Sequence, residues 1–185
     1  MKKIFVITVA FLAVFSQGLQ AESNDDELSV MEALNQNKVT YLKLGVGGIN
    51  IDNEISTAPV VTLGRRFIVD KDMVDVSFSF SESDRDDEKL SYYTFPNLRY
   101  IRFLDGNANA GAYAGAGLSW GGVKDNSSGK RFTGIGGGIT LGYQYNLGDR
   151  VCQIIEMEIS QPVVSSERRG GHPGPSIFLS WGVGF

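Results

Sequence analysis

The chain has 185 residues and a formal net charge of −4, so it is long enough for one domain of ordinary size. An acidic chain of this kind is not expected to bind nucleic acid, and its single cysteine, Cys152, excludes a framework of internal disulfides. The single histidine, His172, leaves no set of His and Cys ligands for a zinc site, and we expect neither a metal nor another cofactor.

The amino terminus has the features of an export signal. Two lysines precede an apolar run over residues 4–15, and a small-residue cleavage site ends at Ala21. The run is shorter than the ~20 residues that a membrane-spanning helix needs. We therefore predict a cleaved signal peptide over residues 1–21, followed by a polar periplasmic lead-in over residues 22–38, to which we assign no function.

Residues 39–185 form a series of segments in which apolar and polar side chains alternate, as they do in strands with one apolar face. Each segment is about 8 to 12 residues long, close to what a tilted strand needs to cross a bilayer. The predicted strands are residues 41–47, 59–69, 73–81, 90–103, 110–120, 134–147, 151–160 and 175–185.

The connections between these strands are expected to alternate in length. Those after the first, third, fifth and seventh strands are long, and those after the second, fourth and sixth are short. Transmembrane barrels have tight periplasmic turns and longer external loops. We therefore expect the long connections outside the cell and both chain ends in the periplasm.

The last strand ends the chain on an aromatic residue. One of its faces is apolar throughout and carries Ile177, Leu179, Trp181, Val183 and Phe185. A soluble sheet has no reason to end in this way. The pattern resembles the terminal signal that the barrel assembly machinery reads in bacterial outer-membrane barrels.

The whole of residues 39–185 resembles the small eight-stranded outer-membrane barrels, such as the OmpX family and the transmembrane domain of OmpA. The terminal strand, the stretch T-L-G-R-R-F-I-V-D at residues 62–70, and the Gly and Ala alternation of the fifth and sixth strands carry the resemblance. It implies an all-β, antiparallel, up-and-down transmembrane β-barrel in the cell outer membrane, in contact with outer-membrane lipid and lipopolysaccharide.

We expect the apolar faces to meet lipid, with aromatic residues near both interfaces. The expected girdle residues are Tyr92 and Trp120 near the external loops, and Tyr100, Tyr145 and Phe185 near the periplasmic turns. A soluble barrel of the lipocalin type would need the reverse arrangement and is the structural alternative. Both faces of the strand at 59–69 carry an arginine, so we place Arg65 on the lipid face near the periplasm, or assume a bulge.

Six charged residues, three of each sign, are predicted to face the barrel interior: Lys43, Arg66, Asp75, Arg99, Glu156 and Glu158. The interior of an eight-stranded barrel is just filled by side chains, and charges are tolerated there only when they are paired. We interpret the set as a salt-bridged polar plug, and the alternative is an ion path or gate.

The favoured function is a structural or surface-interacting role through four external loops that contact an unidentified surface ligand. A narrow porin-like channel with a charged lumen is the alternative. A barrel enzyme that modifies lipid A would use a histidine on a strand, and the predicted strands carry none, so we expect no enzyme. The acids of residues 82–88 are open to a cationic ligand or to solvent alone.

Overall fold

The computed structural model describes residues 38–51, 54–69, 72–85, 88–104, 110–125, 131–148, 151–168 and 173–185. The predicted signal peptide, His172 and all of the predicted lead-in except Lys38 lie outside these residues. Within the described part of the chain, no helix is long and apolar enough to cross a membrane.

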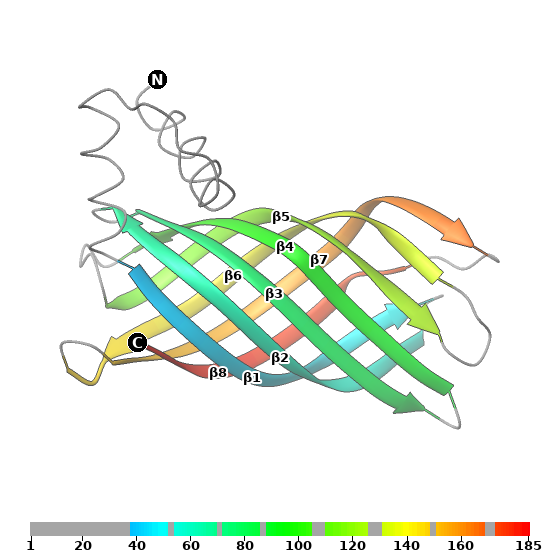
Figure 1. The fold of residues 1–185 in the computed structure, drawn as a ribbon, viewed down its shortest axis with the longest axis horizontal. Coiled ribbons are helices and arrows are strands. Elements are labelled where there is room, and N and C mark those ends of the chain that lie inside the picture. The colour runs from blue at the N-terminus through cyan, green and yellow to red at the C-terminus, as the bar shows by residue number, and fades with distance from the viewer. Residues whose placement is uncertain are drawn as a thin grey trace, which may run out of the picture.

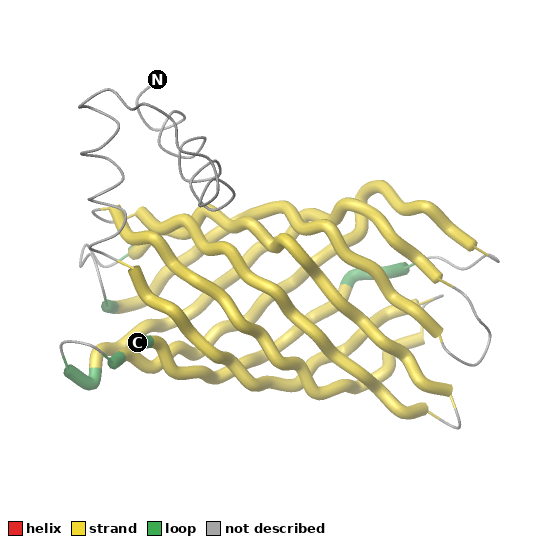
Figure 2. The backbone as a smooth tube through the Cα atoms, in the orientation of Figure 1, coloured by secondary structure: helices red, strands yellow, loops and turns green. Residues whose placement is uncertain are grey.

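Eight strands close into one barrel (Figure 1). They are β1 (Lys38–Ile51), β2 (Glu54–Val69), β3 (Asp72–Arg85), β4 (Glu88–Phe103), β5 (Gly111–Asp125), β6 (Arg131–Asn146), β7 (Cys152–Arg168) and β8 (Ser176–Gly184). Each strand pairs antiparallel with its neighbours in sequence, and β1 pairs with β8. The predicted all-β, up-and-down barrel is therefore confirmed. The strands are strongly tilted along the barrel (Figure 2), as closure of a sheet requires.

The terminal residue takes part in closing the barrel. The amide of Phe185 donates to the carbonyl of Thr40 at 2.8 Å, and the amide of Thr40 donates to the carbonyl of Phe185 at 2.9 Å. We call the end of the barrel that holds this pair the terminal end (left in Figure 1), and the opposite end, where β1 turns into β2, the hairpin end.

The alternation of side chains decides which face of each strand points inward. Along β8, buried and exposed residues alternate, so that Leu179 is 57% exposed while its neighbour Phe178 is 5% exposed. The exposed large hydrophobic side chains lie on the outer surface of the barrel, and the inner surface holds most of the buried polar side chains. The lipocalin-type alternative, with its polar exterior, is therefore wrong.

One predicted girdle residue lies on the other face. The ladder of β4 shifts register between Thr94 and Asn97 against both β3 and β5. Pro96, which has no amide hydrogen to donate, lies inside this interval. Alternation counted from Arg99 across the shift puts Tyr92 outside, but Tyr92 is 8% exposed and points inward.

The other four girdle residues face outward as predicted: Trp120, Tyr100, Tyr145 and Phe185. Tyr93 lies beside Trp120 in place of Tyr92, with ring centroids 6.3 Å apart. Arg65 pairs with Thr40 and Val76, close to the terminal end, and the alternative bulge is absent from the described β2 ladder. Its expected place near the periplasm stays a prediction.

The predicted alternation of long and short connections is wrong. Stretches expected to be external loops continue the hairpins, since β1 pairs with β2 as far as Ile51 and Glu54, and β3 pairs with β4 as far as Arg85 and Glu88. Pairing satisfies the backbone hydrogen bonds of these segments without any further partner. The connection at 104–110, expected to be short, separates β4 from β5 by more residues than lie between β1 and β2.

Candidate functional site

The inside of the barrel is layered along its axis. One apolar cluster lies toward the terminal end and contains Tyr41, Ile68, Met73, Ile101, Phe103, Tyr113, Cys152 and Ile154. A second lies toward the hairpin end and contains Ile49, Ala58, Val60, Tyr92, Val123, Phe132 and Phe178. The predicted lumen charges lie between the two. On β2, for example, Arg66 comes between Ile68 and Val60 in the inward series.

Glu156 on β7 accepts hydrogen bonds from three cations and a phenol. Its Oε1 accepts from the ammonium of Lys43 and from Nη1 of Arg99 at 2.8 Å. Its Oε2 accepts from Nη2 of Arg66 at 2.6 Å and from the hydroxyl of Tyr113 at 2.7 Å. Both carboxylate oxygens of this fully buried side chain are thus occupied by charged or polar donors.

Asp75 on β3 lies directly between two arginines in the sheet, because it pairs with Arg66 on β2 and Arg99 on β4. Nε of Arg66 donates to Oδ2 at 2.9 Å, and Nη2 of Arg99 donates to Oδ1 at 3.1 Å. The hydroxyl of Tyr41 donates to the same carboxylate at 2.8 Å. Neighbouring strands therefore supply one side of the network, and β7 supplies the other side across the lumen.

Arg66 is held between two aromatic rings. Its guanidinium carbon is 5.0 Å from the ring centroid of Tyr41 and 4.9 Å from that of Tyr113. Nη1 also donates to the side-chain oxygen of Gln144 at 2.9 Å. In a desolvated site, cation–π contacts of this kind contribute about 2 kcal/mol or more each.

Glu158 lies at the edge of the network. Its carboxylate accepts hydrogen bonds from Nη1 of Arg99 at 3.0 Å and from the side-chain amide of Asn97 at 3.1 Å, and its side chain is 15% exposed. The geometry therefore brings all six predicted lumen charges into one set of contacts. Glu156 is bonded to three cations, whereas Glu158 is bonded to one.

Sequence reasoning missed the neutral members of this network: Tyr41, Asn97, Tyr113, Thr140 and Gln144. It also missed the two apolar layers. All of these residues point inward, and the same alternation that selected the charges could have selected them except on β4 before its register shift, where it puts Tyr92 on the wrong face.

Glycines make room for the long lumen side chains. Gly64 is directly opposite Tyr41, and an added Cβ at Gly64 would overlap the phenol ring of Tyr41. Gly142 has the same relation to Tyr113. Further pairs of this kind are Lys43 with Gly182 and Arg99 with Gly117. Each long side chain therefore lies flat across a position on the next strand that has no side chain of its own.

These contacts suit a rigid plug. Every carboxylate of the network accepts a hydrogen bond from at least one arginine. Within the described ranges, no group of three or more His, Cys, Asp or Glu side chains could hold a metal ion.

No protein-family model and no curated protein sequence matches the chain. Among solved structures, Neisserial surface protein A superposes with a TM-score of 0.66 at 16% identity, covering 80% of this chain and 95% of that one. Ail of Yersinia pestis, the attachment invasion locus protein, superposes with a TM-score of 0.51 at 16% identity, covering 80% of this chain and 99% of that one. This chain has the fold of the small outer-membrane barrels. The expected likeness to that group of barrels is therefore confirmed for the fold, with most of this barrel and nearly all of each neighbour in the superposition.

The number of cations that each acid of the network binds predicts how much its removal lowers the stability of the barrel. Glu156→Ala leaves three buried cations without their common carboxylate, so we expect a loss of about 3 to 5 kcal/mol in the free energy of unfolding. Glu158→Ala leaves Arg99 bonded to Asp75 and Glu156 and should cost clearly less. The temperature at which the folded gel band converts to the unfolded band measures both, and Glu82→Ala on an exposed position is the control. Equal melting of all three variants would contradict the central place of Glu156.

The glycine contacts give a second prediction. Gly64→Ala puts a methyl group into the phenol of Tyr41 and should lower the same melting temperature, because the ring can move only by disturbing Arg66 and Asp75. Overpacking of this kind typically costs about 1 to 3 kcal/mol. Gly137→Ala is the matched control, since an added Cβ there meets no atom closer than 3.8 Å. A Gly64→Ala barrel as stable as the Gly137→Ala barrel would contradict the close-contact argument.

Proposed function

We propose that the protein is an integral outer-membrane barrel whose lumen is closed and whose hairpins act at the cell surface. The membrane assignment is supported by the broad apolar exterior, the outward aromatic residues toward both ends of the barrel, and the polar interior. The predicted signal peptide would export the chain. The apolar face of β8, which closes the barrel onto β1, would be read by the assembly machinery.

The closed lumen is the observation that carries this proposal. Charged side chains cross the middle of the barrel in direct contact with one another, and an apolar layer lies on either side of them. An ion that entered would have to break buried pairs, and each orphaned partner would cost several kcal/mol. The alternative is a narrow channel, which the charges themselves favour because a conducting pore also needs polar lining.

A surface role is favoured by the length of the hairpins. β3 and β4 stay paired up to Arg85 and Glu88, and the tip between them carries Asp86 and Asp87. This acidic tip suits a cationic partner better than a polyanion such as the heparin analogue named with Ail. We do not propose an enzyme, because the single histidine of the sequence lies outside the strands at position 172.

Conductance separates the closed barrel from the channel. In planar lipid bilayers, the purified folded protein should produce no ion-conducting steps. The double variant Arg99→Ala/Glu156→Ala removes a large cation and the acid that binds it, and should produce steps or fail to fold, which the gel shift reports. Steady conductance by the wild-type protein, absent from a heat-unfolded sample, would replace the closed barrel with the channel.

Cysteine labelling tests the surface role and the orientation. In a Cys152→Ser background, Asp86→Cys should react with a membrane-impermeant maleimide on whole cells, and Lys71→Cys should react only after the outer membrane is permeabilised. The two positions lie in connections at opposite ends of the barrel, between β3 and β4 and between β2 and β3. Labelling of position 71 but not 86 on whole cells would invert the proposed orientation.

A further inference from the structure

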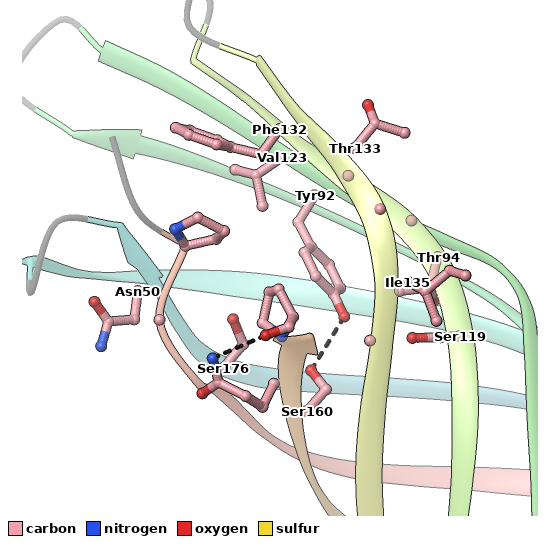
Figure 3. Close-up of a pocket in the computed structure, with 18 residues that line it drawn as sticks. Asn50, Tyr92, Thr94, Ser119, Val123, Phe132, Thr133, Ile135, Ser160 and Ser176 are labelled. Atoms are coloured by element: carbon pink, nitrogen blue, oxygen red, sulfur yellow. Dashed lines mark hydrogen bonds between the residues drawn. The ribbon is translucent and has the colours of Figure 1, made fainter. Parts of the chain in front are cut away.

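A hollow opens inside the barrel near the hairpin end (Figure 3). Its volume is about 490 Å³, which includes space open to solvent. Strands β4 to β7 supply most of its wall, and Asn50 of β1 and the segment from Pro173 to Ser176 complete it. The ladder between β6 and β7 shifts register at Gly136, opposite Pro162, so the wall here is built from irregular backbone and glycine.

The floor of the hollow separates it from the charged network. Tyr92 lines this hollow and also a deeper one that contains Lys43 and Glu158. The ring of Tyr92 packs against that of Phe178, with centroids 5.2 Å apart, and its hydroxyl is 3.3 Å from that of Ser160. A molecule in the outer hollow therefore meets an aromatic floor rather than the lumen charges.

The wall is apolar with a few uncharged polar groups. Its larger side chains include Val123, Phe132 and Pro162, and among the described residues that line it none is charged. Such a lining does not compensate the desolvation of an ion, so it favours a neutral occupant.

Among the described residues of this wall, two polar atoms have no hydrogen-bond partner. They are Oγ1 of Thr94 and the side-chain oxygen of Asn50, and both atoms are buried. Thr94 is 4% exposed. Buried polar groups in proteins are nearly always paired, because leaving one unpaired is costly. Both residues line the same hollow, where a bound molecule could supply the missing partners.

We propose that this hollow binds a small uncharged molecule with an apolar body of about one ring and at least one hydroxyl or amide group. The ring would pack against Tyr92 and Phe132, and the polar group would bond to Thr94 or Asn50. Because part of the hollow is open to solvent, only part of the ring would be enclosed. The site lies beyond the closed lumen of the proposed function and does not depend on it.

Two probes that differ by one hydroxyl test the chemistry. 4-Fluorophenol and fluorobenzene are titrated against the full barrel in lipid nanodiscs, with binding followed by fluorine NMR and empty nanodiscs as the blank. We expect 4-fluorophenol to bind about tenfold more tightly than fluorobenzene, because the hydroxyl can pair with a buried orphan atom.

Variants locate the binding. Thr94→Val keeps the shape of the side chain and should reduce the affinity for 4-fluorophenol about five- to tenfold while leaving fluorobenzene unchanged. Thr62→Val is the matched control, since Thr62 is also 4% exposed but lies outside this hollow, and it should change neither probe. Ser119→Leu should abolish binding of both, because Ser119 is directly opposite Gly136 and a leucine there extends into the hollow.

The proposal is overturned if neither probe binds above the empty nanodiscs. It is also overturned if the two probes bind equally and Thr94→Val changes nothing, because the hollow is then only an apolar depression. The gel shift reports whether each variant is folded, and the comparison of the two probes on the wild-type barrel decides the question even if Ser119→Leu fails to fold.

Discussion

Closure by eight strands makes an interior only as wide as the side chains that fill it, and this narrowness governs the rest of the structure. Side chains from opposite walls meet in the middle, so Glu156 of β7 reaches Lys43 of β1 and Arg66 of β2 directly. Closure also satisfies the backbone, since the carboxy-terminal residue pairs with Thr40 and leaves no open edge there.

The buried charges illustrate an asymmetry of such networks. Taking ions out of water is costly, and their mutual attraction offsets that cost only when geometry and hydrogen bonding are complete. Here the phenols of Tyr41 and Tyr113 complete it, by donating to the carboxylates and by placing their rings on either side of Arg66. Because each buried ion has lost its hydration, we expect the complete network to add little net stability compared with an apolar core of the same volume.

The sequence carried most of the fold, because a period of two assigns each strand residue to one face and lipid requires one face to be apolar. The inward position of the six charges followed from that rule alone. Local rules failed where the period breaks, as at Pro96, which reverses the face of Tyr92. They also could not say which charge meets which, since the contact between Lys43 and Glu156 joins strands far apart in the chain. The hollow beside Thr94 depends on a register shift in the β6–β7 ladder and has no counterpart in the sequence pattern.

The glycines beneath the lumen side chains have a consequence for how neighbouring strands find their alignment. Sliding one strand by a single residue would turn its apolar face inward, and the membrane excludes that error. Sliding by two residues keeps every face correct, so hydrophobicity cannot detect it. Such a slide would put Thr62 or Arg66, rather than Gly64, beneath the phenol of Tyr41. The glycines thus prevent two-residue slippage, because any other residue would overlap the long side chain opposite it. By fixing the register in this way, they help to set the shear and the diameter of the barrel.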